Sequence, residues 1–306
     1  MEDNFDSTAS AGENRYSDTR GLAGEPVLFT KAVIDGLAHG GGLYVPARVP
    51  SLSLDDICGL AELPYAKRAA AIYRAFGVDL PAETVDSLME GAYGEQFDSE
   101  DICPITSLDE RTHVLELWHG PTSAFKDMAL QCLPRFFSAS AEALRERGEL
   151  DHDFLILVAT SGDTGKAALE GFKNAEHVRI GVLFPDGGVS DIQRKQMVTT
   201  TGDNVQVWGV RGNFDDCQTG VKSVFGDDEY AKTLLTEHNV TLSSANSINW
   251  GRLMPQIVYY ISSYAELVAK GKIEAGKPID VCVPTGNFGN ILAAWYAKRM
   301  GTPIEM

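Results

Sequence analysis

Residues 154–165 read Phe154-Leu155-Ile156-Leu157-Val158-Ala159-Thr160-Ser161-Gly162-Asp163-Thr164-Gly165, an apolar run that ends in a polar turn. A short apolar run before such a turn predicts a strand that is buried on both faces. Further strands are predicted at 178–184 and 205–210, and helices at 190–200 and 214–225. Buried strands that alternate with helices predict an α/β fold with mostly parallel sheets flanked by helices.

The pattern changes near residue 100 of the 306 residues. Helical periodicity at 30–37, 63–76 and 82–93 predicts a helix-rich N-terminal domain over 15–100. In the α/β region, 101–306, we expect a helix over 127–147 that bends at Pro134, a helix over 250–269 and a short strand at 281–283. Residues 1–14 have neither a basic start nor an apolar core, so we expect a disordered tail and no signal peptide.

The overall charge limits the possible partners. The chain has 43 acidic and 26 basic side chains and a net charge of -17, which argues against nucleic acid and anionic membrane surfaces. No window approaches the roughly 18 apolar residues that a membrane span needs. The five cysteines are scattered and form no Cys-x-x-Cys pair, which indicates a reducing, cytoplasmic protein without a disulfide framework.

Several common catalytic motifs are missing from the sequence. There is no Rossmann Gly-x-Gly-x-x-Gly pattern and no Gly-x-Ser-x-Gly nucleophile elbow. The segment 160–166 is no ATP-binding P-loop, because Thr160 replaces the first glycine and Ala167 replaces the hydroxyl ligand of magnesium. The six histidines lack zinc-ligand spacing, so no metal site is predicted.

Lys126 is the candidate nucleophile. It follows the turn-prone pair Gly120-Pro121 and opens an apolar helical stretch. An amine at a helix start lies near the positive end of the helix dipole, which lowers its pKa and favours attack on an aldehyde. The alternative is a solvent-exposed lysine at the start of a helix. For the nearby His119 we expect a structural hydrogen bond to the turn.

One candidate anion site lies between the predicted strand at 281–283 and a helix that begins near Ile291. Its glycines allow backbone N–H groups to converge on a phosphate at the start of the helix. The alternative is an ordinary turn between a strand and a helix. The residues of this candidate are Gly286, Asn287, Phe288, Gly289 and Asn290.

Two further loops offer groups that can bind a substrate carboxylate or phosphate. In the first, an N-cap formed by Asp163 or Thr164 can coexist with ligand binding. In the second, Arg252 can bind an oxyanion in a bidentate manner, with a surface ion pair as the alternative. The candidate residues are Ser161, Gly162, Asp163 and Thr164 in the first loop, and Asn246, Ser247, Asn249 and Arg252 in the second.

The set of motifs, in this order, resembles the threonine synthases of the longer bacterial and fungal type. The resemblance covers roughly residues 16–303. Its segments are 16–21, 41–46, 119–131, 161–165, 214–218, 246–252 and 286–290. Within 214–218 we assign the residues from Asp215 to Gln218 to helix capping and packing.

The resemblance implies a fold-type II pyridoxal-phosphate enzyme. Members of that family convert O-phospho-L-homoserine and water into L-threonine and phosphate by β,γ-elimination and replacement. By similarity, Lys126 forms the Schiff base with the cofactor and then acts as the base, and residues 286–290 hold the cofactor phosphate. The two loops around Asp163 and Arg252 would bind the substrate, and we expect a monomer or homodimer.

One departure from the family leaves alternatives open. Family members continue well past residue 304, so the chain is expected to be truncated at its C-terminus. The alternatives are another pyridoxal-phosphate eliminase, such as a threonine or serine dehydratase or a cysteate synthase, and an inactive remnant.

Overall fold

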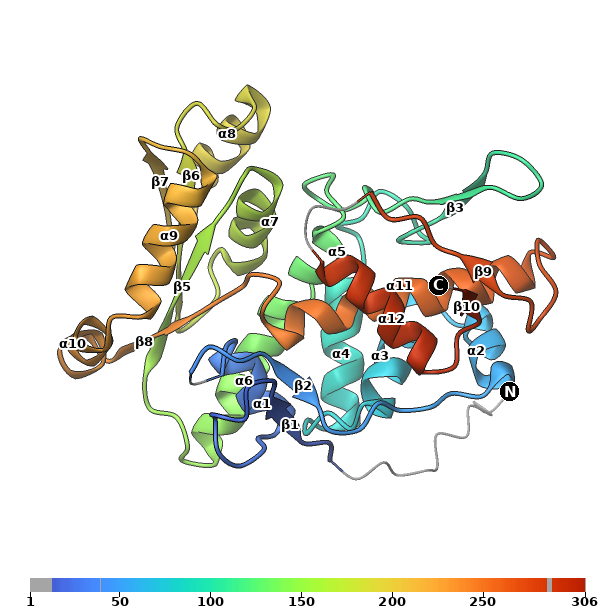
Figure 1. Ribbon diagram of the computed structural model, residues 1–306, viewed down its shortest axis with the longest axis horizontal. Coiled ribbons are helices and arrows are strands. Elements are labelled where there is room, and N and C mark those ends of the chain that lie inside the picture. The colour runs from blue at the N-terminus through green and yellow to red at the C-terminus, as the bar shows by residue number, and fades with distance from the viewer. Residues whose placement is uncertain (1–12, 39, 285–287, 306) are drawn as a thin grey trace.

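The computed structural model describes residues 13–38, 40–284 and 288–305 (Figure 1). Its largest sheet has four parallel strands in the order β7-β6-β5-β8. The three strands predicted between residues 154 and 210 are confirmed, and β8 adds a strand that the pattern did not predict. These strands are β5 (Asp153–Ala159), β6 (Val178–Pro185), β7 (Val205–Val210) and β8 (Val240–Ser243).

Helices cover both faces of this sheet, as the apolar strands predicted (Figure 1). Side chains alternate along β5, so Val158 lies in the main core while Leu157 and Ala159 pack with Cys217 on the opposite face. Ser190 and Gln193 form a capping box at the start of one of these helices. The helices are α7 (Asp163–Phe172), α8 (Asp191–Val198), α9 (Phe214–Phe225) and α10 (Asp228–His238).

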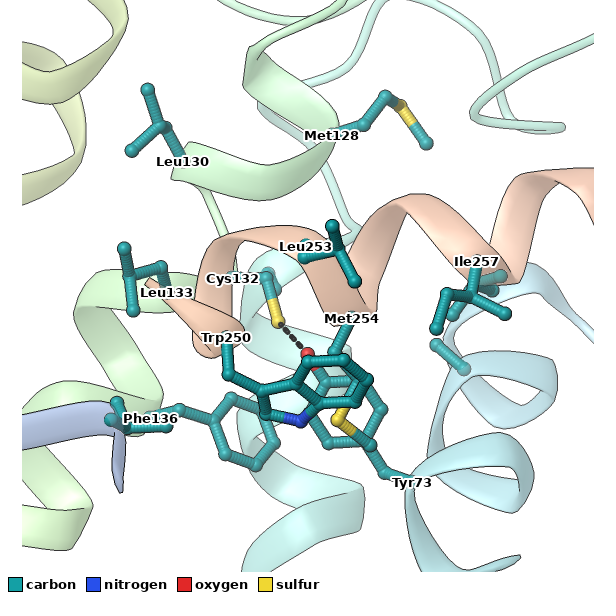
Figure 2. Packing of buried hydrophobic residues seen from close by; sticks show 14 of the residues in the cluster. Tyr73, Met128, Leu130, Cys132, Leu133, Phe136, Trp250, Leu253, Met254 and Ile257 are labelled. Carbon is teal, nitrogen blue, oxygen red and sulfur yellow. Dashed lines mark hydrogen bonds between the residues drawn. The ribbon is translucent and has the colours of Figure 1, made fainter. Parts of the chain in front are cut away.

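Helix α11 (Trp250–Ala269) is the centre of the second, mainly helical part of the molecule. It is buried from Trp250 through Leu267, because helices surround it and its sequence is apolar on nearly every side. Arg68 and Glu266 form a buried ion pair at 2.6 Å on its surface. Figure 2 shows α11 side chains Trp250, Leu253, Met254 and Ile257 packed near Tyr73, Cys132 and Phe136.

The elements around α11 come from both ends of the chain. The predicted helices at 30–37, 63–76 and 82–93 are confirmed as α1 (Phe29–Asp35), α3 (Tyr65–Ala75) and α4 (Ala82–Ala92). The remaining elements here are β1 (Tyr16–Asp18), β2 (Tyr44–Pro46), α2 (Leu54–Gly59), η1 (Leu60–Glu62), β3 (Ile105–Ser107), β4 (His113–Leu115), α12 (Gly289–Arg299), β9 (Ile279–Asp280) and β10 (Ile304–Glu305).

The prediction of a single bent helix over 127–147 is wrong. The structure has two helices, α5 (Asp127–Leu130) and α6 (Leu133–Glu146), and the break precedes Pro134. Proline has no N–H, so Pro134 cannot donate a helical hydrogen bond to the carbonyl of Leu130. That carbonyl lies against Gly171 of α7, where an added Cβ would be 2.1 Å from Leu130 O.

The strand expected at 281–283 is also wrong. The paired strand is β9, which ends at Asp280 and is parallel to β10. The pattern cannot locate this strand, because a three-residue apolar run carries no information about its pairing partner. The following helix, α12, begins at Gly289, two residues earlier than expected.

The predicted disordered tail at 1–14 falls mostly on residues 1–12, which lie outside the described residues. Asn14 is buried, and its N–H donates to the carbonyl of Gly77 at 3.0 Å. Its side-chain Nδ2 donates to the carbonyl of Arg48 at 2.7 Å. The described chain is therefore already packed at Asn14, one residue before the predicted boundary.

Among the described residues, no helix combines the length and the hydropathy that crossing a membrane requires.

We expect Gly171→Ala to destabilise the protein by about 1–3 kcal/mol, because the added methyl group would overlap the carbonyl of Leu130. The matched control is Gly220→Ala in α9, where an added Cβ meets no atom within 4 Å. The control should be neutral or stabilise by about 0.5–1 kcal/mol, through helix propensity. Urea unfolding measures both, and equal effects of the two substitutions would contradict the close approach of α7.

Candidate functional site

A cavity of about 1140 Å³ lies at the carboxyl ends of β5 and β8. Parallel strands place their C-terminal loops at one edge of the sheet, which is where such folds bind ligands. The cavity is lined by Lys126, by parts of both predicted substrate loops and by Pro284. Another hollow of about 680 Å³, at the exposed turn Asp109–Thr112, contains none of these groups.

Lys126 is buried at 7% exposure, so the alternative of a solvent-exposed lysine is wrong. Its Nζ donates a hydrogen bond to Asp163 Oδ2 at 2.5 Å and lies 4.4 Å from the ring centroid of Phe125. Burial lowers the pKa of Lys126, Arg252 lowers it further, and Asp163 opposes both effects. The expected contribution of a helix dipole needs correction, because α5 has only four residues and desolvation is the main cause.

A buried carboxylate closes the turn that presents Lys126. Asp127 is fully buried, and its two oxygens accept hydrogen bonds from the N–H and the hydroxyl of Thr122 at 2.8 and 2.7 Å. Burial raises the pKa of Asp127. Sequence reasoning did not single out these two residues, although their spacing of five, directly after Pro121, is the available signal.

The loop after β5 lies at the cavity, but its cap differs from the prediction. Gly162 is the N-cap of α7, with φ at 143°, and neither Asp163 nor Thr164 caps the helix. Thr160 Oγ1 accepts instead from the N–H groups of Gly162 and Gly165, at 3.0 and 2.9 Å. Ser161 and Thr164 line the cavity, and Asp163 contacts the amine of Lys126. Sequence reasoning missed the role of Thr160.

Arg252 is also buried, at 3% exposure, so its alternative as a surface ion pair is wrong. Its Nη1 donates to the carbonyl of Ala245 at 2.8 Å, while its Nε has no hydrogen-bond partner among the described residues. Burial lowers its pKa to about 10. A buried guanidinium that lines a cavity is suited to an anionic ligand.

The other members of this loop divide into two groups. Asn246 and Ser247 line the cavity and are half-buried. Asn249 does not line it, because its carboxamide caps α11 at Gly251 and donates to the carbonyls of Val33 and Ser244. The predicted substrate contact of Asn249 is therefore corrected to a structural role.

The predicted phosphate turn is described only in part, because Gly286 and Asn287 lie outside the described residues. Phe288 is exposed and precedes α12, whose first residue, Gly289, is buried beside Ser247. A Cβ on Gly289 would lie 3.4 Å from the Cβ of Ser247, which itself lines the cavity. The start of α12 and the cavity wall are thus in contact.

Helix α9 contributes residues to the cavity that sequence reasoning did not assign to a site. Gln218 and Lys222 both line it, and their spacing of four is the signal, because it places them on one helix face. Capping and packing roles are confirmed for Asp216, in a capping box, and for the buried Cys217. His119 was expected to bond to the turn, but its two ring nitrogens bond to the carboxylates of Asp98 and Glu116 instead, so the predicted partner is wrong.

Comparison with known proteins gives the family. Residues 15–93 match the family model described as threonine synthase N terminus. Threonine synthase of Pseudomonas aeruginosa is 41% identical over 293 residues, which are 95% of this chain and 58% of the relative. Threonine synthase-like 1 of Homo sapiens is 44% identical over 286 residues, which are 91% of this chain and 38% of the relative.

Solved structures agree with these sequence matches. PLP-bound threonine synthase from Brucella melitensis superposes with a TM-score of 0.82 at 41% identity, over 96% of this chain and 59% of that one. Yeast threonine synthase also gives 0.82, at 36% identity, over 95% of this chain and 57% of that one. The chain therefore spans about half the length of these relatives, and less of threonine synthase-like 1.

Together, the parallel sheet, the flanking helices and the lysine cavity define a protein of the fold-type II pyridoxal-phosphate class. Within that class, the sequence and structural matches are to threonine synthases over nearly the whole chain. The chain belongs to the threonine synthase family.

We expect Asp163→Asn to lower the pKa of Lys126 further, because the carboxylate stabilises the protonated amine. Lys126 would then lose its proton, and react with limiting acetic anhydride, at lower pH than in the wild type. Mass spectrometry of the acetylated fraction against pH measures the shift. Asp191→Asn, at the equivalent first position of α8, is the control. An unchanged or raised midpoint in Asp163→Asn would contradict the contact.

Proposed function

We propose that this protein acts as a threonine synthase, a carbon–oxygen lyase that releases phosphate. It would convert O-phospho-L-homoserine and water into L-threonine and phosphate with pyridoxal 5′-phosphate. One observation carries the proposal: a buried amine of lowered pKa, Lys126, shares a cavity with a buried guanidinium, Arg252, that has an unused donor. The family relationship supports the same activity.

The described residues fit this cofactor. Lys126 Nζ is shielded from water and has a lowered pKa, which favours the neutral amine that condenses with an aldehyde. The small residue Gly289 leaves little bulk at the start of α12, and we assign Phe288, Gly289 and Asn290, with Gly286 and Asn287, to holding the phosphate. The PLP-bound relative from Brucella melitensis supports the choice of cofactor. When bound, pyridoxal phosphate supplies an electron sink for charge that develops on the substrate.

The chain's own groups have separate tasks in this proposal. Asp163 holds Lys126 Nζ in place before substrate arrives, and Nζ then accepts and returns the substrate proton. Arg252, Ser247 and Asn246 bind the substrate phosphate, while Ser161 and Thr164 bind its carboxylate. Gly162 does not line the cavity, because its N–H donates to Thr160 Oγ1. The half-buried walls around Ser247 limit the access of water to the reacting groups.

We infer a cytoplasmic location from the cysteines. All five are free of disulfides, and Cys103, Cys132 and Cys217 are buried as thiols, which suits a reducing compartment.

We expect Lys126→Ala to abolish covalent attachment of pyridoxal phosphate. Among the described residues that line the cavity, Lys222 is the other lysine, and it therefore serves as the control. Borohydride reduction followed by peptide mass spectrometry measures the attachment. In the wild type the reduced adduct should be on Lys126, and Lys222→Ala, the control, should leave it there. An adduct on another residue of the wild type would refute the assignment.

We expect Arg252→Gln to raise the KM for O-phospho-L-homoserine by about 30-fold or more, because the substrate phosphate loses the buried guanidinium as its charged partner. Phosphate release and threonine formation are measured together in steady state. Arg194→Gln, on the exposed surface of α8, is the control. If the wild type deaminates threonine or serine but releases no phosphate from O-phospho-L-homoserine, the proposed substrate is wrong.

A further inference from the structure

Two adjacent tyrosines of α11 converge on one atom of α12. The hydroxyl of Tyr259 donates to Asn290 Oδ1 at 2.5 Å, and that of Tyr260 donates to the same oxygen at 2.6 Å. Tyr259 is fully buried and Tyr260 is 5% exposed. Neighbouring residues of a helix normally point in different directions. The two hydroxyls nevertheless meet at one acceptor, Asn290 Oδ1. Their ring centroids are 4.8 Å apart.

The two hydroxyls are donors and remain neutral. Burial raises the pKa of both tyrosines well above the ordinary value. A carboxamide oxygen has two lone pairs, and two O–H donors occupy both. The amide nitrogen of Asn290, with two hydrogens, is left without a hydrogen-bond partner among the described residues.

The pair also belongs to a buried polar network that leads to the substrate loop. Tyr259 Oη lies 3.4 Å from Gln256 Oε1, and Gln256 Nε2 donates to the carbonyl of Arg252 at 2.9 Å. Gln256 Nε2 is also 4.0 Å from a Cβ built on Gly289. The orientation of Asn290 is therefore fixed by buried groups of α11 and not by solvent.

We propose that Tyr259 and Tyr260 are positioning residues, which hold the carboxamide of Asn290 so that its Nδ2 donates to the phosphate of the bound cofactor. The inference rests on the proposed function and deepens it. In this inference, the tyrosine pair lies outside the predicted phosphate turn and makes the protein prefer pyridoxal 5′-phosphate to pyridoxal. A purely structural role, tying α11 to α12, would affect both ligands equally.

The test measures the affinity of both ligands by fluorescence titration, for the wild type and for Tyr259→Phe, Tyr260→Phe and the double variant. We expect the double variant to lose about 10- to 100-fold in affinity for pyridoxal 5′-phosphate, the range for a hydrogen bond to a charged group, and less than about 3-fold for pyridoxal. Tyr264→Phe, on the same helix as the pair, is the control, because its hydroxyl bonds to the backbone of Lys277 and Gly276 in the segment after α11. It should lower the melting temperature without changing the ratio of the two affinities.

A second variant separates orientation from stability. The carboxylate of Asn290→Asp can still accept both tyrosine hydrogen bonds, but it replaces the Nδ2 donors with negative charge. We expect it to lose affinity for pyridoxal 5′-phosphate and to keep its affinity for pyridoxal.

The outcomes distinguish the inference from the function on which it rests. If the wild type forms the Lys126 adduct while the tyrosine variants lose both ligands equally, or neither, the inference is overturned and the proposed function stands. If the wild type forms no adduct with either ligand, the proposed function fails and the inference fails with it.

Discussion

The packing of α7 against α5 determines where the reactive amine lies. Pro134 leaves the carbonyl of Leu130 without a helical donor, and the backbone of Gly171 occupies the space beside that carbonyl. The same two helices carry Lys126 immediately before α5 and Asp163 as the first residue of α7. A side chain at position 171 would separate the helices, and with them the 2.5 Å contact between Lys126 and Asp163.

Opposing electrostatic effects act on that amine. Burial and the charge of Arg252 favour the neutral form of Lys126, whereas Asp163 favours the charged form. The balance keeps a nucleophilic amine in a chain whose net charge of -17 would otherwise favour protonated lysines. Arg252 contributes in two ways, because its charge acts on Lys126 while its guanidinium lines the cavity, where an anion can bind.

The sequence predicted those features that depend on periodicity. Helices α9 and α11 and strand β7 have the expected bounds, because each has a long, regular pattern between clear turns. It failed where tertiary contacts decide. The break before Pro134 depends on the contact with α7. The side chain of Asn249 donates to the carbonyl of Val33 in α1, which is far away in the sequence. The lowered pKa of Lys126 was attributed to a dipole, because burial cannot be seen in a local motif.

The hydrogen bond from Asn249 to Val33 joins residues 216 positions apart. Closing so large a loop carries a high entropic penalty, and contacts between distant segments slow folding. During synthesis on the ribosome, α1 emerges long before the segment that completes its contacts. During synthesis, the substrate pocket therefore cannot be completed until residue 249 has emerged.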